Sequence, residues 1–421
     1  MPVKTAAVLT LGCRLNHADS ALLTRRLEQV GYRMVSERHP DTDLIVVNSC
    51  AVTAEAVRKS RQALRRCRQN FPFARLVVTG CAALLHADDF KADGADLVLG
   101  NPQKVDLIQT LAGLTAAEPA EAGTVFYERS TSSFPFRSRA FIKIQEGCNN
   151  FCTYCIVPYL RGRERSRDHH EVLSDCRQAI ADGFPEIILT GVNTCAYNAD
   201  GRDLGALVRE IAALPGDFRI RLSSTEPHPH NLQLLDVMAD TPKVCRFLHL
   251  SLQHGCDRIL QQMNRHYSTA DYRHFVELAR RKLPGIHIGT DLIVGFPGET
   301  EADFEANRRF VAEMAFANMH IFTYSPRPGT PAADYGDQVP AAVAARRSAE
   351  LKQLAAQSAR NFAASQLGQA LPVIFETKRN GFWRGWSDNY LEVVCPEDAA
   401  EPRKIVTITV KKANLPILSD T

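Results

Sequence analysis

Three cysteines stand close together in the segment GCNNFCTYC, residues 147–155. Cys148, Cys152 and Cys155 follow a C-x3-C-x2-C spacing. Thiolates on one tight loop are typical ligands of an iron–sulfur cluster or a zinc ion, because the loop can wrap around a single metal centre. We therefore expect metal binding here rather than a disulfide framework.

No fourth cysteine follows at ferredoxin spacing. Two-cluster ferredoxins use a tighter C-x2-C-x2-C run with another cysteine just before a proline, so a simple electron carrier is disfavoured. Structural zinc needs four ligands, and the nearest candidates, His169, His170 and Cys176, lie beyond a basic stretch. Zinc stays the weaker alternative. Three ligands on a four-iron cluster would leave one iron open to another molecule.

Three further cysteines each follow a predicted strand: Cys13 after VLTLG, Cys50 after LIVVNS and Cys81 after LVVTG. Singly, each would more often be a small buried hydrophobe. Parallel strands of one sheet end on the same edge, however, so we expect the three thiols to share a crevice. The remaining cysteines show no such pattern and are expected to be structural: Cys67, Cys176, Cys195, Cys245, Cys256 and Cys395.

The two groups of three cysteines must be positioned by strands and helices, which the alternation of apolar runs and helical patterns predicts. Residues 5–110 predict βαβ units with a parallel sheet, and the polar segment 111–140 predicts a linker. From 141 to about 330, six apolar runs separated by helical patterns predict a partial barrel or a wound sheet. A long alanine-rich helix is expected over 341–366, followed by strands of a small all-β module.

Composition sets the broad class. The 421 residues are 45% hydrophobic and carry a formal net charge of +3, which is typical of a globular protein with a sizeable core. No apolar run approaches the ~20 residues of a membrane span, and the N-terminus does not look like a secretory signal. We expect a cytoplasmic location and no membrane partner. The basic stretches 57–69 and 161–167 would suit an anionic partner.

The cysteine loop, with Tyr154 before its last cysteine, resembles the radical S-adenosylmethionine (SAM) superfamily. The resemblance implies a partial (βα)6 barrel over 139–366 with its site at the carboxyl ends of the strands. It also implies a [4Fe–4S] cluster on the three cysteines, whose open iron binds SAM for cleavage to a 5′-deoxyadenosyl radical. Segments ILTGVN, RLSSTEP and TDLIVGFPGET resemble its SAM-binding loops, and the implied contacts are Tyr154, Gly191, Asn193, Ser223, Glu226 and Asp291.

A second three-cysteine group ahead of such a barrel resembles the methylthiotransferases of this superfamily, over nearly the whole chain. The resemblance implies a flavodoxin- or Rossmann-like domain over 1–125, with a second [4Fe–4S] cluster on Cys13, Cys50 and Cys81. It implies a TRAM-like RNA-binding module over 367–421. The implied reaction removes hydrogen from an unactivated carbon and inserts a sulfur that a second SAM has methylated.

The substrate of this family differs between branches. TLGCRLNHADS and LSLQHGCDRILQQMNRHYS most resemble the branch that acts on threonylcarbamoyladenosine at position 37, beside the tRNA anticodon. At Ser49 the chain departs from the threonine common in the family. Isopentenyladenosine in tRNA, a ribosomal-protein aspartate, and a non-enzymatic iron–sulfur RNA-binding protein are the alternatives. The resemblance implies two partners, the anticodon loop of tRNA and a flavodoxin or ferredoxin reductant.

Some residues suit RNA contact. Basic side chains could neutralise phosphates, although a solvated helix face is the commoner role. They are Arg58, Lys59, Arg61, Arg65, Arg66, Arg68, Arg161, Arg163, Arg165 and Arg167. Aromatic side chains of the last module could stack on bases or fill its core. They are Phe382, Trp383, Trp386 and Tyr390.

Overall fold

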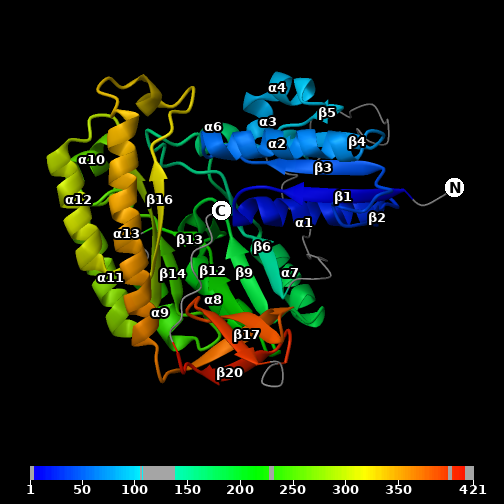
Figure 1. Ribbon diagram of the computed structural model, residues 1–421. Coiled ribbons are helices and arrows are strands. Elements are labelled where there is room, and N and C mark those ends of the chain that lie inside the picture. The colour runs from blue at the N-terminus through cyan, green and yellow to red at the C-terminus, as the bar shows by residue number, and fades with distance from the viewer. Residues whose placement is uncertain (1–3, 105–106, 108–137, 227–231, 397–400, 413–421) are drawn as a thin grey trace.

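The computed structural model describes most of the chain and shows an α/β fold with a parallel sheet, a barrel-like group of strands and a C-terminal antiparallel sheet (Figure 1). No helix in the described part is both long and apolar enough to cross a membrane. The linker predicted at 111–140 lies almost wholly outside the described residues. The described residues are 4–104, 107, 138–226, 232–396 and 401–412.

The N-terminal sheet has the strand order β2-β1-β3-β4-β5, and every pair is parallel. This is the flavodoxin-like order, so the predicted parallel sheet is confirmed. The two edge strands have only two residues each, too few to show a periodic pattern in sequence. The strands are β1 (Thr5–Thr10), β2 (Arg33–Met34), β3 (Leu44–Ser49), β4 (Arg75–Gly80) and β5 (Leu97–Val98).

Helices flank this sheet. The core strands read as continuous apolar runs because both faces are buried. Helix α1 packs against β1 on one side and against β6 (Arg139–Lys143) of the barrel on the other, which explains why polar residues of α1 are buried. The helices are α1 (Arg14–Gln29), α2 (Ala54–Asn70), α3 (Cys81–Leu85), α4 (Ala87–Ala92) and the short η1 (Pro102–Lys104).

Seven parallel strands follow at the six places that the apolar runs predicted, because one predicted run, 218–224, divides into β12 and β13. They form two sheets of order β12-β9-β6 and β13-β14-β15-β16. Segment 219–225 joins the sheets, because β12 pairs with β9 and its continuation β13 pairs with β14. The result is an open barrel. Its strands after β6 are β9 (Glu186–Thr190), β12 (Arg219–Leu222), β13 (Ser224–Thr225), β14 (Phe247–Leu250), β15 (His287–Val294) and β16 (Asn318–Thr323).

Helices cover the outside of the barrel (Figure 1). Side-chain caps fix several starts: Ser268 and Thr300 each form a capping box with the aspartate three residues on. The predicted alanine-rich helix is confirmed as α13 (Ala341–Ser365), which packs along β16. The other outer helices are α7 (His169–Ala181), α8 (Leu204–Ala212), α9 (Leu232–Asp240), α10 (Asp257–Gln262), α11 (Thr269–Lys282) and α12 (Glu301–Met314).

The C-terminal module is an antiparallel sheet of order β19-β18-β17-β20, as the all-β prediction requires. Strand β18 was not predicted. Its sequence FWRGWS has no apolar alternation, and Gly385 allows the close approach of β17, since a Cβ there would lie 2.3 Å from the Ile374 carbonyl oxygen. The strands are β17 (Ala370–Arg379), β18 (Phe382–Ser387), β19 (Glu392–Pro396) and β20 (Ile405–Thr409).

This module docks on the amino ends of the barrel strands. Glu186, at the start of β9, pairs with Arg219 and Arg221, and these guanidinium groups also donate to backbone carbonyls of residues 372 and 386–388. Burial alone would raise the pKa of Glu186, but the two arginines hold it well below its usual value. The module therefore lies at the opposite end of the barrel strands from the 148–155 loop.

Candidate functional site

The 148–155 loop follows β6 and the short strand β7 (Gln145–Glu146). Cys148, Cys152 and Cys155, here called the barrel trio, line one cavity of about 320 Å³ at the carboxyl ends of the strands. Gly147 makes the tight entry to the loop: its φ is +72°, and a Cβ there would lie 2.0 Å from the Arg163 carbonyl oxygen. The structure thus brings the predicted ligands together.

Four of the six predicted SAM contacts line the same cavity. They are Tyr154, Asn193, Glu226 and Asp291. The Oδ1 atom of Asn193 is buried and has no hydrogen-bond partner within the described structure. Buried polar atoms are normally paired, so this oxygen fits a ligand that the cavity would receive.

Gly191 and Ser223 are not among the lining residues. Gly191 lies against Gln145, whose Oε1 accepts hydrogen bonds from the backbone N–H groups of Val192 (2.9 Å) and Asn193 (3.0 Å). Ser223 stands at the junction of β12 and β13, with its Oγ buried and unpaired in the described part of the chain. Sequence patterns missed Gln145, which holds the loop that presents Asn193.

A buried arginine joins the cavity to the barrel trio. Arg265 places Nη1 3.2 Å from the Cys152 Sγ and Nη2 2.8 Å from the Glu226 Oε1. Asn150 donates to the other Glu226 oxygen at 2.7 Å, as does Asn193 at 3.2 Å. Glu226 is thereby fixed by three donors. Sequence reasoning missed Arg265, because nothing in MNRHYS distinguishes a buried arginine from an exposed one.

Asp291 lies between two histidines that were not predicted. Its Oδ2 is 3.1 Å from the His249 Nε2, and its Oδ1 is 3.1 Å from the His320 Nδ1. One ligand atom from each of the three residues lies within 4.8 Å of the others. Burial would raise the pKa of Asp291, but the two imidazoles hold it well below its usual value. The carboxylate is therefore fixed in the cavity wall.

Cys13, Cys50 and Cys81, here called the N-terminal trio, converge at the carboxyl edge of the first sheet. Cys13 precedes α1, Cys50 follows β3 and Cys81 begins α3. Burial, together with the neighbouring thiols of Cys13 and Cys81, raises the pKa of Cys50 to about 12. In Figure 1 the arrowheads of β1 and β3 point towards the barrel. Sheet order thus gathers three thiols that are remote in sequence.

Asn16 ties two of these loops together. Its Nδ2 donates to the carbonyl oxygens of Leu11 (2.8 Å) and Ser49 (3.0 Å), which stand beside Cys13 and Cys50. The two sites are also near each other, because Val52 and Thr53, which follow Cys50 in the same loop, line the cavity of the barrel trio. The chain next to Cys50 therefore forms part of the wall beside the barrel trio.

Two of the arginines that could have contacted phosphate are instead buried. Arg161 lies with Nε 3.3 Å from the Cys81 Sγ and pairs with Glu146 at 2.8 Å. Arg167 pairs with Asp175 at 2.6 Å. The phosphate prediction is wrong for both, because a basic run looks alike in sequence whether its side chains are exposed or paired inside. Arg163 stays exposed, 4.4 Å from the Phe151 ring.

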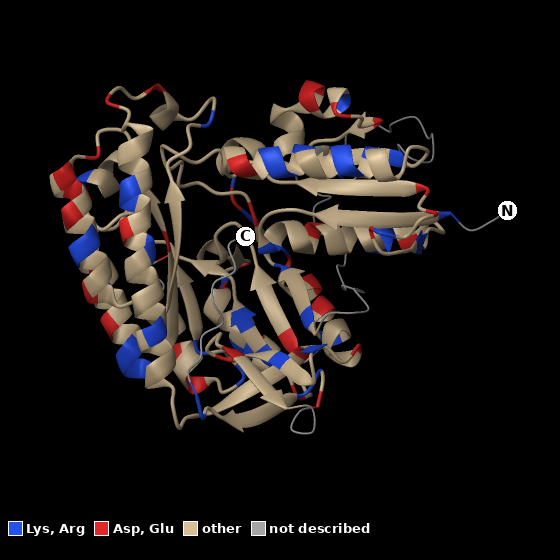
Figure 2. Ribbon diagram, viewed as in Figure 1, with Lys and Arg blue, Asp and Glu red and all other residues tan. Residues whose placement is uncertain are grey.

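Basic positions run along α2 (Figure 2), and most of their side chains pair with nearby carboxylates. Arg61 and Arg65 share Asp93 at 2.6 and 2.9 Å. Arg58 pairs with Glu55, and Arg68 with Asp96. Lys59 and Arg66 are exposed. These pairs favour the solvated-face interpretation of the helix over a dedicated phosphate groove.

The aromatic residues of the last module divide into two groups. The Tyr390 ring stacks on Trp386 with 4.8 Å between the ring centroids, and it packs against Phe247 of β14, also at 4.8 Å. Tyr390 and Trp386 therefore close the barrel at the amino ends of its strands. Trp383 packs on the core of the module, whereas Phe382 is 48% exposed. Of the four, Phe382 is the side chain best placed to stack on a base.

The residues present fit iron–sulfur clusters better than zinc. His169 contacts Glu210 at 2.8 Å, and Cys176 is packed in the barrel core, so the predicted zinc alternative gains no support. Burial raises the pKa of Cys148 to about 11 and that of Cys155 to about 12. These thiols would lose their protons on binding metal. Among the described residues that line the cavity there is no fourth cysteine, which leaves a coordination position open.

Comparison with known proteins agrees with this geometry. Residues 142–311 match the family described as the radical SAM superfamily, and residues 5–100 match the uncharacterized protein family UPF0004. The open barrel with three cysteines on one loop defines the class of radical SAM proteins. The flavodoxin-like sheet with its own cysteine trio, and relatives over nearly the full length, define the family within that class. The chain belongs to the radical SAM methylthiotransferase family.

Two relatives and one solved structure illustrate the similarity. The threonylcarbamoyladenosine tRNA methylthiotransferase MtaB of Bacillus subtilis is 34% identical, over 98% of this chain and 95% of that protein. The tRNA-2-methylthio-N(6)-dimethylallyladenosine synthase of Wolbachia pipientis wMel is 32% identical, over 98% of each. The radical SAM methyltransferase TsrM of Kitasatospora setae matches with a TM-score of 0.57 at 18% identity, covering 78% of this chain and 77% of that one. At that identity the match shows the fold alone.

Proposed function

We propose that the protein converts N6-threonylcarbamoyladenosine at position 37 of tRNA to its 2-methylthio derivative. One observation carries the proposal. The residues that follow Cys50 line the cavity of the barrel trio, so the loop that carries Cys50 borders the space beside that trio. A reaction that needs both a radical and an inserted sulfur at one carbon requires such an arrangement.

The barrel trio would hold a [4Fe–4S] cluster, and the cluster with bound SAM supplies a 5′-deoxyadenosyl radical. The protein's own residues bind and orient the cofactor. Glu226, held by Arg265 and Asn150, offers a fixed carboxylate to the SAM amino group. The unpaired Oδ1 of Asn193 offers an acceptor in the same wall. Further predicted contacts are Tyr154, Gly191, Ser223 and Asp291.

The N-terminal trio of Cys13, Cys50 and Cys81 would hold the second [4Fe–4S] cluster and present the sulfur to be inserted. Thr53 caps α2 and lies in the cavity wall, so it connects Cys50 to the space where the base would enter. Ser325, after β16, accepts from the Ala54 backbone N–H at 3.4 Å and closes the other side. These residues exclude water and orient the base between the two sites.

Three domains would divide this work: 1–125 with the second cluster, 139–366 with SAM, and a TRAM-like RNA-binding module at 367–421. Because the module docks at the amino ends of the barrel strands, we expect it to contact tRNA outside the anticodon loop, which enters from the cavity side. A flavodoxin or ferredoxin would supply electrons. A cytoplasmic location fits a tRNA substrate.

A specific observation keeps one alternative in view. Relatives from Wolbachia, at 32–33% identity, carry a dimethylallyladenosine name, which corresponds to the isopentenyladenosine alternative. The MtaB relatives are 34–35% identical, a small margin in favour of threonylcarbamoyladenosine. The ribosomal-protein substrate gains no comparable support. Membership of an enzyme family argues against the non-enzymatic alternative.

Nucleoside analysis of tRNA tests the proposal directly. In a strain that lacks this gene, the 2-methylthio form of threonylcarbamoyladenosine should disappear and return with a plasmid copy. Loss of the methylthio form of isopentenyladenosine instead would establish the alternative, and unchanged tRNA would refute both. Anaerobic reconstitution should also load about eight irons per chain. Four or fewer would remove the second cluster from the proposal.

A further inference from the structure

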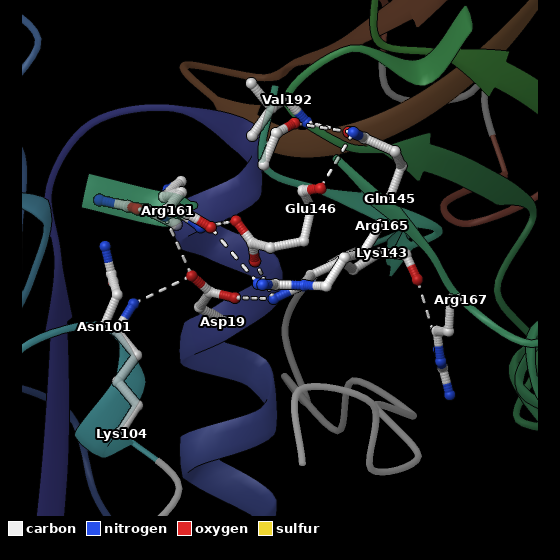
Figure 3. A network of polar contacts seen from close by, with 12 residues as sticks. Asp19, Asn101, Lys104, Lys143, Gln145, Glu146, Arg161, Arg165, Arg167 and Val192 are labelled. Atoms are coloured by element: carbon white, nitrogen blue, oxygen red, sulfur yellow. Dashed lines mark hydrogen bonds and ion pairs between the residues drawn. The ribbon is translucent and has the colours of Figure 1, made fainter. Parts of the chain in front are cut away.

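Five buried ionisable side chains form one network (Figure 3), here called the buried ion network, and one of them, Arg161, contacts the Cys81 sulfur. Two come from the N-terminal part and three from the barrel part. The Asp19 carboxylate pairs with Lys104 and Lys143, each at 2.9 Å, and with Arg161 at 3.2 Å. Glu146 pairs with Arg161 at 2.8 Å and with Lys143. The members are Asp19, Lys104, Lys143, Glu146 and Arg161.

This network does not balance its own charge. It holds three basic groups and two carboxylates, and all five residues are less than a tenth exposed. Each carboxylate lies against at least two of the basic groups: Asp19 contacts all three, and Glu146 contacts Lys143 and Arg161. One positive charge is left in excess. A buried charge is costly unless an opposite charge lies beside it.

Arg161 is the member of the network that lies beside the N-terminal trio. Its Nε lies 3.3 Å from the Cys81 Sγ, and it also interacts electrostatically with Cys13 and Cys50. A four-iron cluster on three thiolates has a net charge of about −1 when oxidised and about −2 when reduced. The excess positive charge of the network therefore balances the net negative charge of the oxidised cluster site, and it favours the addition of one electron to the cluster.

We propose that Arg161 is a positioning residue that holds the N-terminal cluster and raises its reduction potential. The inference rests on the proposed ligation by Cys13, Cys50 and Cys81. An N–H donor to a ligating sulfur and a nearby positive charge both stabilise the reduced form. Arg161 ends helix α6 (Val157–Arg161), which begins just after Cys155, so the same helix couples the two cysteine sites.

The test uses the full chain with Cys148, Cys152 and Cys155 all replaced by alanine, so that only the N-terminal cluster forms. The reconstituted protein is titrated anaerobically, with the reduced cluster followed by electron paramagnetic resonance. In this background Arg161→Met should lower the ratio of reduced to oxidised cluster at a fixed potential about tenfold, which is a midpoint about 59 mV more negative. Arg161→Lys keeps the charge and should shift the midpoint less, with the same sign.

Two further variants separate charge from general disturbance. Lys104→Met removes one charge of the network without touching a sulfur, so it should give a shift of the same sign, smaller than that of Arg161→Met. Arg58→Met removes a charge that is paired with Glu55 on the exposed face of α2, and it should leave the midpoint unchanged. Iron content and circular dichroism show whether each variant is folded and loaded.

The outcomes are distinguishable. If the parent with three alanines binds no iron, the proposed ligation fails, and the role of Arg161 fails with it. If the parent binds about four irons and Arg161→Met does so with an unchanged midpoint, ligation stands and the inference is overturned. If Arg161→Met does not fold, unchanged midpoints in both Arg161→Lys and Lys104→Met overturn it equally.

Discussion

Cys148, Cys152 and Cys155 come from one loop, whereas Cys13, Cys50 and Cys81 come from the ends of three parallel strands. The loop holds its own thiols by local backbone geometry, with Gly147 at its entry. The N-terminal trio depends instead on strand order and on side chains from elsewhere. The difference shows that a local cluster site needs a loop, while a dispersed one needs a completed fold.

The two sites nevertheless share a feature. Each has a buried arginine on one sulfur: Arg265 lies 3.2 Å from the Cys152 Sγ, and Arg161 lies 3.3 Å from the Cys81 Sγ. Arg265 belongs to the same barrel as its trio, but Arg161 reaches the N-terminal trio from the barrel. The N-terminal site is therefore completed only when the two parts dock.

Removing each trio in turn gives the largest expected effects. Alanine in place of the whole barrel trio should abolish both SAM cleavage and the methylthio product. The residues replaced are Cys148, Cys152 and Cys155. Replacing Cys13, Cys50 and Cys81 should abolish the product alone, because the barrel site would still cleave SAM. The measurements are 5′-deoxyadenosine and methylthio nucleoside by mass spectrometry, with about four irons left in each protein. Normal product from either variant would break the assignment of two functional sites.

The same contrast explains what sequence could predict. The barrel trio, the barrel strands and the parallel first sheet follow from spacing and periodicity, which are local properties. Arg161 was counted among the side chains that could contact phosphate, because its partner Asp19 reaches it only through the docking of α1 on the barrel. Strand β18 was missed for lack of a pattern. Apart from that strand, the sequence could not show how polar residues distant in the chain pair with one another.

Crowded glycines should give the next largest effects. Gly12 has a φ of +96°, and a Cβ there would lie 2.7 Å from the Cys50 Cβ. Gly12→Ala and Gly147→Ala should each lower the free energy of unfolding by about 3 kcal/mol or more, from overpacking added to backbone strain. Chemical denaturation measures this, and iron analysis should show that Gly12→Ala loses the N-terminal cluster while Gly147→Ala loses the barrel cluster.

Gly183 provides the matched control. Its φ of +78° is similarly left-handed, but no atom lies within 4 Å of a Cβ built there. Gly183→Ala should cost only about 1–2 kcal/mol and keep both clusters. Equal losses in all three variants would mean that strain, and not contact with the cysteine loops, decides the outcome.

Asn16→Ala tests the dependence of the dispersed site on a long-range tie. The variant leaves the carbonyl groups of Leu11 and Ser49 without their buried donor, so it should cost about 2 kcal/mol. Iron in the N-terminal site should fall, whereas SAM cleavage by the barrel should persist. The control is Asn307→Ala, which removes a buried bond to the Gly255 N–H at 2.8 Å. If both variants bind as much iron as the unchanged protein, the hydrogen bonds of Asn16 do not hold the N-terminal trio in place.

Thr53→Ala should have the smallest effect on stability and activity, and it should still distinguish the role of the N-terminal site from that of the barrel site. Thr53 accepts the Ala56 N–H at 3.1 Å as the cap of α2, and Asp203 accepts the Ala206 N–H at 2.8 Å as the cap of α8. Alanine at either position should cost about 1 kcal/mol of unfolding free energy. Only Thr53 lies beside Cys50 in the cavity wall, so its loss should also lower product formation about fivefold. Because the barrel trio and Glu226 stay in place, SAM cleavage should fall much less than product formation, and equal product from the two variants would show that the cap acts on stability alone.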